Sequence, residues 1–285
     1  MNFLKSAFVM MYMMGAMGLC IYAGYALFSG GSVLAWTGVL LTAAPFMTFI
    51  SWIMMMRNVA RTSANFPVLI ALGGIGLTLS IWAWAQQSGP FLAIELAGAG
   101  WVGFLIYSFW YSGFGKRSSR IRIGSTLPDF VLKSSKGGVR HSSDFVGKAS
   151  ILIFYRGNWC PLCMAQVKEL AKRYQDLEAA NVRVAMISPQ PHKNTVSLAK
   201  KFDIGFEFYT DENNQAARAL GIANPFGIPL GMQMLGYKSE TVLPTVVIID
   251  AQGRVLWLHE TDNYRIRPEP DVFLGVLQEH GLATT

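Results

Sequence analysis

The chain has 285 residues, enough for two domains, and its composition is uneven: 52% of the residues are hydrophobic and only 14% are charged. This composition excludes an ordinary soluble protein. The formal net charge is +7, but from residue 126 onward 17 Lys and Arg stand against 16 Asp and Glu, so the positive excess lies in the first part of the chain. There it flanks apolar runs, where basic residues set the orientation of membrane helices, and we therefore expect no nucleic-acid partner.

Four apolar runs occupy the first 115 residues, and each is close to the roughly 20 residues that a membrane-spanning helix needs. They cover residues 7–28, 33–56, 67–85 and 91–111. The first run is too long for the apolar region of a signal peptide and lacks an A-x-A-like cleavage site, so we expect it to be retained. The connections are short, which favours antiparallel neighbours. The sequence thus predicts an all-α four-helix transmembrane bundle over residues 1–115.

Basic residues gather on one side of the membrane that these helices are predicted to cross. They are Lys5, Arg57, Arg61, Lys116, Arg117, Arg120 and Arg122, of which the last four form a basic juxtamembrane linker at 116–125. The loops on the other side contain no basic residue. The positive-inside rule therefore places both termini, and everything after residue 115, on the cytoplasmic side of an inner or plasma membrane.

A few residues inside the apolar runs depart from the aliphatic pattern. Glu95 is the one charged residue within a run; it indicates either a functional site for an ion, a quinone or a partner helix, or a side chain that reaches the interface. Cys20 is expected to be a small packing residue, because a transmembrane thiol relay needs paired cysteines. Gly98, Gly100 and Gly103 are expected to let helices approach closely.

From residue 126 the pattern changes to short strands that alternate with amphipathic helices, which indicates an α/β domain over 126–285. A buried strand is predicted at 149–155, followed directly by a helix that runs to about residue 180. The next elements are a strand at 182–187, a helix at 193–202, a strand at 206–209, a helix at 213–220, an insertion at 221–241, a hairpin of 245–250 with 255–259, and a helix at 271–280.

The buried strand leads into the sequence Cys160-Pro161-Leu162-Cys163 at the start of a helix. A helix N-terminus lowers the pKa of a thiol and favours the thiolate, and a second cysteine one turn later can close a disulfide. A zinc half-site or two core cysteines are the alternatives. Zinc would need further ligands, and neither a second CxxC nor an H-x₃₋₅-H is present. We therefore expect no metal and no cofactor besides a redox-active Cys160–Cys163 disulfide.

Five stretches resemble one known family. They are TLPDFVL at 126–132, FYRGNWCPLC at 154–163, ISPQ at 187–190, LPT at 243–245 with the strand to Asp250, and DNYRIRPE at 262–269. The segment from residue 124 to about 281 resembles the peroxiredoxin-like branch of the alkyl hydroperoxide reductase and thiol-specific antioxidant superfamily. The resemblance implies a thioredoxin fold and an antioxidant oxidoreductase, attached to the membrane bundle.

The sequence departs from the peroxiredoxin motif at two of its three positions. True peroxiredoxins carry Pro-x-x-x-Thr/Ser-x-x-Cys on this turn, and placing Cys163 on the peroxide-reacting cysteine puts Cys160 at the Thr and Arg156 at the Pro. The hydroxyl that polarises the peroxide is thus replaced by a thiol. This favours dithiol–disulfide chemistry over peroxide reduction.

The resemblance also implies candidate site residues beyond the cysteines. Arg156, Tyr264 and Arg267 match recurrent residues of the branch, where they would orient an anionic or peroxide oxygen; the alternative is solvated arginines or local ion pairs.

In a thioredoxin fold, Pro244 is the candidate cis-proline, expected to lie against Cys160. Trp159 and Thr245, which adjoin the first cysteine and the proline, are candidates for substrate orientation.

Two assignments of the attacking cysteine compete. The thioredoxin pattern favours Cys160, which begins the helix and feels its dipole, with Cys163 as the resolving thiol. The peroxiredoxin alignment favours Cys163. Because the motif's hydroxyl and proline are missing, we predict that Cys160 attacks and has the lower pKa.

The sequence favours a membrane-anchored thiol-disulfide oxidoreductase on the cytoplasmic face, which reduces a protein disulfide or a peroxide and is re-reduced by a cytosolic thiol. One alternative is a peroxidase of alkyl or lipid hydroperoxides held beside the bilayer. The other is a non-catalytic accessory subunit of a larger membrane complex.

Overall fold

The structure is a computed structural model, and it describes residues 2–115 and 119–283. The chain forms two compact units: one comprises residues 4–56 and 62–113, and the other contains residues 57–61 and the chain from Phe114 onward, together with the first residues of the chain. The predicted boundaries at residues 115 and 125 stay predictions, and Lys116 and Arg117 of the basic linker lie outside the described residues.

The first unit is built from four helices. They are α1 (Asn2–Phe28), α2 (Val33–Met56), α3 (Pro67–Ala85) and α4 (Phe91–Leu105), and α4 continues through a π-helical segment, η1 (Ile106–Tyr111). All four are long and apolar enough to cross a membrane, as predicted. Many of their large apolar side chains face outward, as expected of helices that meet lipid.

Small residues let these helices pack closely. A Cβ on Gly100 would lie 2.5 Å from Thr42 Oγ1, and one on Gly103 would lie 2.6 Å from Tyr12 Cε2, so close approach is confirmed at both positions. The same prediction is wrong for Gly98, which faces open space because it lies on another face of α4. Cys20 packs at the edge of an apolar cluster, as expected.

The second unit is a mixed seven-stranded sheet in the order β2-β1-β5-β4-β3-β8-β9. The strands are β1 (Val131–Ser134), β2 (Val139–His141), β3 (Ser150–Phe154), β4 (Arg183–Ser188), β5 (Glu207–Thr210), β8 (Thr245–Ile249) and β9 (Val255–Glu260). Strands β3, β4 and β5 are parallel, whereas β8 is antiparallel to both β3 and β9. A separate short sheet pairs β6 (Ala223–Asn224) with β7 (Thr241–Val242).

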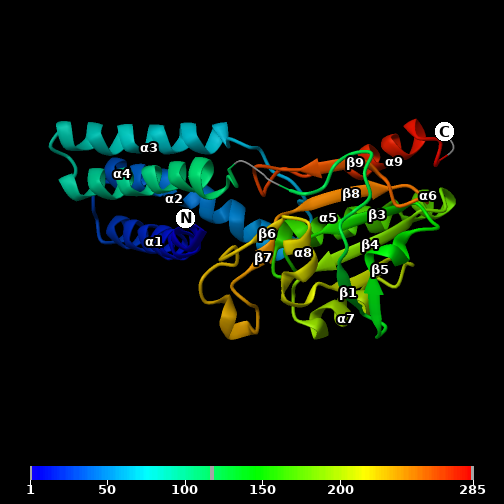
Figure 1. Cartoon of the computed structure of the whole chain (residues 1–285). Helices are drawn as coiled ribbons and strands as arrows, with labels where there is room; N and C mark the ends of the chain where they lie inside the picture. The colour runs from blue at the N-terminus through cyan, green and yellow to red at the C-terminus, as the bar shows by residue number, and fades with distance from the viewer. Residues whose placement is uncertain (1, 116–118, 284–285) are drawn as a thin grey trace. The chain divides into compact units, whose positions relative to one another are not determined.

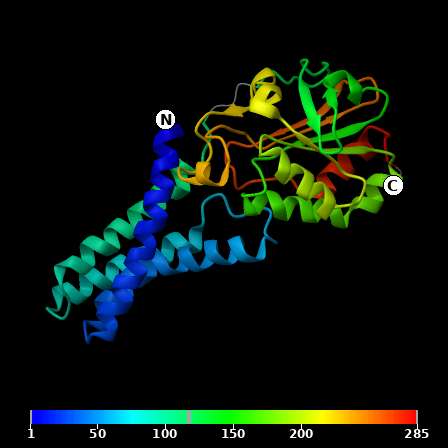
Figure 2. The same ribbon diagram turned by 90° about the horizontal axis from the view of Figure 1, so that it is seen from below.

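Helices cover both faces of this sheet. The α-helices are α5 (Pro161–Lys172), α6 (Tyr174–Ala179), α7 (His192–Lys201), α8 (Gln215–Ala219) and α9 (Pro270–Glu279), and the 3₁₀ turns are η2 (Ser142–Phe145), η3 (Glu212–Asn214) and η4 (Met232–Leu235). The labels are shown in Figure 1, and Figure 2 shows α5 and α8 on opposite sides of the strands. The predicted single helix to residue 180 is broken at Arg173, whose φ of −102° and ψ of 15° are not helical.

The central strand β3 explains how the site is positioned. All five residues of its sequence SILIF are buried, as is usual for a strand covered on both faces. Leu152 and Phe154 join the apolar cluster that includes α8 residues, so by the two-residue period Ile151 and Ile153 face the other side. The strand therefore ends rigidly at Phe154, next to the loop that leads to the cysteines. This is the thioredoxin-like arrangement that the sequence predicted.

Candidate active site

The two cysteines lie at the start of α5. Cys160 is the N-cap residue with an extended backbone, and Pro161 is the first helical residue, where its fixed φ suits a helix start. Cys163 follows one turn later. Both thiols are free, and both are buried, with exposed fractions of 2% for Cys160 and 0% for Cys163. The sulfur atoms of both cysteines are therefore largely screened from bulk solvent.

Arg267 provides the positive charge beside this pair. Its guanidinium is buried, and Nη2 lies 3.4 Å from Cys163 Sγ and 3.9 Å from Cys160 Sγ. Its Nη1 donates a hydrogen bond of 3.0 Å to Gln166 Oε1, one turn after Cys163 on α5. Arg267, one of the candidate orienting residues, thus contacts both thiols, and Gln166 fixes the position of its guanidinium.

The electrostatics favour Cys163 as the thiolate. Burial opposes its ionisation, but the hydrogen bond from the Cys160 thiol and the charges of Arg267 and Arg156 outweigh burial and lower the pKa of Cys163 to about 5. The hydrogen bond to Cys163 raises the pKa of Cys160 above its ordinary value, and burial adds to this rise.

The prediction that Cys160 has the lower pKa is therefore wrong. It rested on the helix dipole, which is equivalent to roughly half a charge at the N-terminus. The hydrogen bond from the Cys160 thiol has the larger effect, together with a full guanidinium charge in a buried site that is closer to Cys163 than to Cys160.

Arg156 is buried on the loop between β3 and α5. Its Cζ lies 4.6 Å from the ring centre of Trp159 and 5.2 Å from that of Tyr264, within the range of cation–π interactions. Its Nη2 donates to the carbonyl oxygen of Gly227 at 2.5 Å. The structure thus places three predicted site residues, Arg156, Trp159 and Tyr264, in one cluster beside the cysteines.

The backbone of the same loop is fixed by polar contacts. The Arg156 carbonyl accepts hydrogen bonds from Trp159 Nε1 at 3.1 Å and from Thr241 Oγ1 at 3.0 Å. The amide of Asn158 donates to Gln190 Oε1 at 2.7 Å. Gly157 has a φ of +138°, and a Cβ there would lie 2.8 Å from Trp159 Cδ1, so a glycine is required.

Pro244 and Thr245 begin β8 beside this loop. Thr245 pairs with Phe154, the last residue of β3, and Pro244 is buried at the same end of the sheet. However, the described residues contain no cis peptide bond, so the prediction of a cis Pro244 is wrong. The Leu243 amide donates to Ile222 O, and the backbone then runs directly into β8. A trans proline fits this extended path, because the chain does not change direction at Pro244. The Thr245 hydroxyl donates to Leu243 O.

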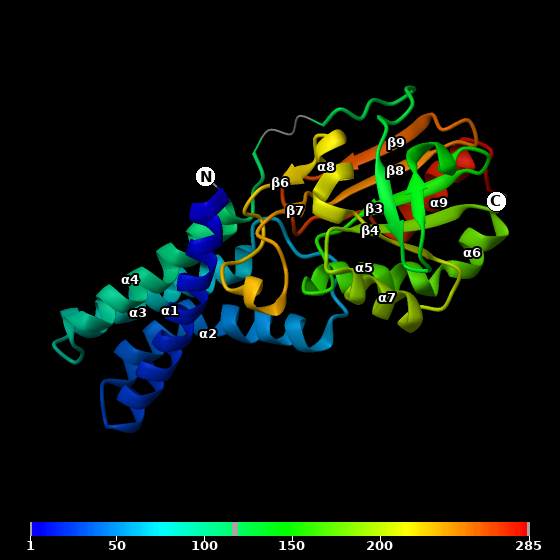
Figure 3. The ribbon, with the colours of Figure 1, turned by 60° about the horizontal axis from the view of Figure 1, so that its bottom comes forward.

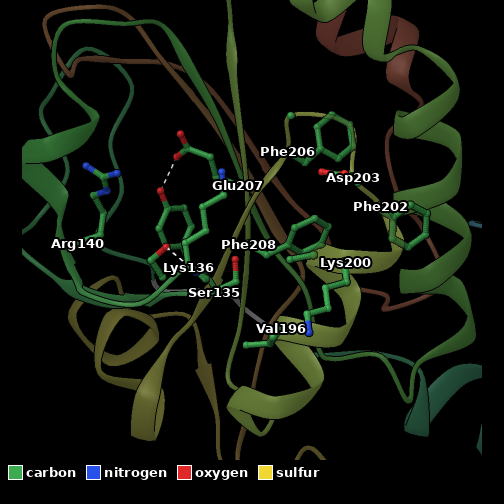
Figure 4. A pocket seen from close by; sticks show the side chains of 14 residues that line it. Ser135, Lys136, Arg140, Val196, Lys200, Phe202, Asp203, Phe206, Glu207 and Phe208 are labelled. Carbon is green, nitrogen blue, oxygen red and sulfur yellow. Dashed lines mark hydrogen bonds between the residues drawn. The ribbon is translucent and has the colours of Figure 1, made fainter.

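Two features lie apart from the cysteine cluster. Glu95 is exposed on α4, in the helical unit. A cavity of about 560 Å³ opens beside β5 and α7, among residues that include Lys136, Arg140 and Phe208 (Figure 4), and none of its lining residues belongs to the cysteine cluster.

Sequence reasoning missed two buried glutamines of the site, Gln166 and Gln190. Gln166 stands three residues after Cys163, on the same face of α5, and a polar residue on a buried helix face is a signal that could have been used. Gln190 ends the ISPQ motif; its Nε2 donates to Tyr155 Oη and to Thr195 Oγ1, both at 3.2 Å. Its role depends on tertiary contacts, which the sequence does not display.

Comparisons with known proteins find a matching family and similar chains. Residues 123–258 match the AhpC/TSA family. The thiol-disulfide oxidoreductase ResA of Geobacillus thermodenitrificans is 26% identical over 146 residues, which cover 51% of this chain and 73% of that protein. Peroxiredoxin Bcp of Escherichia coli is 26% identical over 160 residues, or 56% of this chain and 97% of that protein.

Among solved structures, the peroxidoxin BcpB of Mycobacterium tuberculosis aligns with 56% of this chain and 98% of its own, at a TM-score of 0.47 and 18% identity.

Proposed function

Because the C-terminal half of the chain carries an AhpC/TSA-family domain with a thioredoxin-like fold, we propose that it is a thiol-based oxidoreductase in which Cys163 attacks a hydroperoxide and Cys160 resolves the product. The observation that carries this proposal is the shorter distance from Arg267 Nη2 to Cys163 Sγ than to Cys160 Sγ. The nearer thiol is the one kept ionised, and the thiolate is the nucleophile.

The reaction has two steps on this pair. The Cys163 thiolate attacks the terminal oxygen of the hydroperoxide, the O–O bond breaks, and the alkoxide takes up a proton to leave as an alcohol while Cys163 becomes a sulfenic acid. The Cys160 thiol then attacks the sulfenic sulfur, which forms the disulfide and releases water. An external dithiol, itself oxidised to a disulfide, returns both cysteines to thiols.

Burial favours an oxidant whose reacting group can enter along a narrow path. A protein disulfide must bring its own sulfur atom into line with the attacking thiolate, and Cys163 has no exposed surface. A hydroperoxide needs only a narrow path. In addition, Arg267 Nε has no hydrogen-bond partner among the described residues, which leaves a buried donor for an oxygen atom of the substrate.

Exchange with a protein disulfide is the second candidate function. It is favoured by the CxxC spacing and by the similarity to proteins named ResA, thiol-disulfide oxidoreductases. In that reaction Cys163 forms a mixed disulfide and Cys160 displaces it, so that two electrons pass to the substrate. Opening of the loop that carries Trp159 would have to expose the sulfur atoms.

The setting of this chemistry is also part of the proposal. The four apolar helices anchor the domain to a bilayer, and the positive-inside rule places it on the cytoplasmic face, where a cytosolic thiol is the reductant. The alternative is a non-catalytic accessory subunit, in which the redox domain only docks to a membrane complex. In that case, replacement of both cysteines by serine would leave function intact.

Rapid mixing of the reduced full-length chain with hydrogen peroxide tests the proposed function. The expected result is disulfide formation between Cys160 and Cys163, with the Cys160→Ser variant stopping at a dimedone-reactive sulfenic acid on Cys163. If the chain does not react with peroxide but is oxidised rapidly by a disulfide substrate, the result would instead support exchange with a protein disulfide.

A further inference from the structure

The insertion between β6 and β7 is uncharged and unusually apolar at its surface. No charged residue occurs between Arg218 and Lys238. The exposed fractions are 49% for Phe226, 92% for Met234 and 64% for Leu235. Figure 3 shows this segment leaving β6, turning through a short helix and returning to β7 clear of the main sheet. Water-exposed apolar side chains grouped on one loop indicate a surface that meets another apolar phase.

Both ends of the insertion are tied to the active-site loop. On the first arm, the Gly227 carbonyl accepts the 2.5 Å hydrogen bond from Arg156 Nη2. On the second arm, the Tyr237 hydroxyl donates to Asn158 Oδ1 and accepts from Asn194 Nδ2 at 3.1 Å. Arg156 and Asn158 lie directly before the cysteines, so a displacement of the insertion acts on the loop that positions them.

The base of the insertion also contacts the beginning of the chain. Asn2 Nδ2 donates to Asn224 Oδ1 at 2.9 Å, and the ring of Phe3 meets that of Phe226 edge to face, with centres 5.9 Å apart. Asn2 and Phe3 belong to the same compact unit as the insertion, yet they are also the first residues of α1, a helix long enough to span a membrane. The insertion therefore contacts Asn2 and Phe3 within its own unit, and the chain continues from these residues into α1.

We propose that the insertion over residues 225–237 docks the redox unit onto the phospholipid bilayer, with Phe226, Leu230, Met234 and Leu235 entering its interface. Residues 57–61 and Phe114, which come after α2 and η1 in the sequence, also belong to this unit, so the chain connects the unit directly to the apolar helices. An uncharged loop with exposed Phe, Leu and Met suits the boundary between headgroups and acyl chains, because burial there is favourable for apolar side chains and unfavourable for charged ones. No second macromolecule is needed to cover it.

Docking also deepens the proposed function, on which this part of the inference rests. The insertion is joined to Arg156, and Arg156 is one of the two cations that lower the pKa of Cys163. A loop in the interface would therefore bring the cysteine pair to oxidised acyl chains, so the substrate class is a hydroperoxide carried by the bilayer.

Site-specific photocrosslinking tests the docking without relying on catalysis. Benzoylphenylalanine is placed at Leu235 in the full-length chain, reconstituted in vesicles of phosphatidylethanolamine and phosphatidylglycerol. Val139 on β2 has the same exposed fraction, 64%, and is the matched control, while Met14 on α1, 67% exposed, is the positive control. The proposal predicts lipid adducts, read by mass spectrometry, at positions 235 and 14 but not at 139.

Three results would overturn the proposal: no lipid adduct at 235 while position 14 reacts, equal adducts at 235 and 139, or adducts at 235 that are exclusively with protein. The last result would identify a protein-docking surface instead.

A second measurement addresses the substrate class. The double variant Met234→Ser with Leu235→Ser should react with hydrogen peroxide at the wild-type rate but reduce a phospholipid hydroperoxide in the vesicles at least several-fold more slowly. Equal slowing with both oxidants, or no slowing with either, contradicts delivery from the bilayer. If the wild-type chain reduces neither oxidant, the proposed function fails, while the crosslinking result still decides the docking.

Discussion

Arg267 Nη2 lies 3.4 Å from Cys163 Sγ, half an ångström closer than to Cys160 Sγ at 3.9 Å. In a buried site the interaction between a cation and a thiolate is only weakly screened, so this asymmetry adds to the Cys160–Cys163 hydrogen bond in separating the pKa values of the two thiols. Under the proposed function, the inner cysteine of the CxxC pair is therefore the nucleophile. Cys160 keeps its proton and is the proposed resolving thiol.

Replacing Arg267 tests the source of the asymmetry. Arg267→Ala removes the nearest positive charge and leaves burial unopposed, so the pKa of Cys163 should rise by about 1–3 units. At neutral pH the rate of alkylation of Cys163 should then fall, and Arg267→Lys should restore part of it because the charge returns without the planar fork. The measurement is the pH dependence of iodoacetamide labelling. An unchanged profile in Arg267→Ala would show that Arg267 does not set the pKa.

Gln166 positions Arg267, and its effect should be seen in the same profile. Gln166→Ala removes the 3.0 Å acceptor of Arg267 Nη1 and lets the guanidinium leave the thiols, so the pKa of Cys163 should rise, though by less than in Arg267→Ala. Gln252→Ala, in the exposed turn between β8 and β9, is the control and should leave the profile unchanged. A merely structural role for Gln166 would lower thermal stability without moving the pKa.

The sequence was sufficient to predict the elements that carry the site. The buried strand before the cysteines, the start of the helix after them and the hairpin of β8 and β9 follow from apolar runs and turn residues, and each was predicted within a few residues. The relative acidity of the cysteines was not predictable in this way. It depends on the hydrogen bond between the two thiols and on Arg267, more than 100 positions away, which lies closer to Cys163.

Local rules also explain the incorrect prediction for Pro244. A proline before a strand is compatible with either isomer, and the path of the chain into β8 decides between them.

The residues of the polar contacts, Gln166, Gln190 and Tyr237, come from separate segments and meet only in the folded domain. By contrast, Arg156, Tyr264 and Arg267 were found because the family resemblance supplied the tertiary information that spacing lacks.

Gly157 should not tolerate a side chain. Gly157→Ala forces an L-residue to a φ of +138° and places its Cβ 2.8 Å from Trp159 Cδ1, which together should lower the free energy of unfolding by about 1–3 kcal/mol. Gly275→Ala on α9 is the control, because that glycine has open space and no positive φ, and it should be neutral or slightly stabilising. Thermal unfolding of the two variants in the same detergent makes the comparison. Equal stability would contradict the required glycine.

The orientation of the chain follows from the basic residues. With Lys5, Arg57, Arg61 and the linker on one side, we predict that both ends of the chain are cytoplasmic. A cytoplasm-active reporter fused after the last residue should function, and a periplasm- or exterior-active reporter at Ser88, between α3 and α4, should function as well. Activity of an exterior reporter at the C-terminus would reverse the orientation and exclude a cytosolic reductant.

Competitive alkylation of the reduced full-length chain at mildly acidic pH tests most directly which thiol is the nucleophile. With a pKa of about 5, Cys163 is mostly thiolate above that pH, so its labelling rate should be nearly constant from neutral pH downward and should fall only as the pH passes through about 5. Cys160 should be labelled appreciably only at alkaline pH, because its pKa is raised. Peptide mass spectrometry should therefore find the label on Cys163 first. Preferential labelling of Cys160 in acid would contradict the assignment.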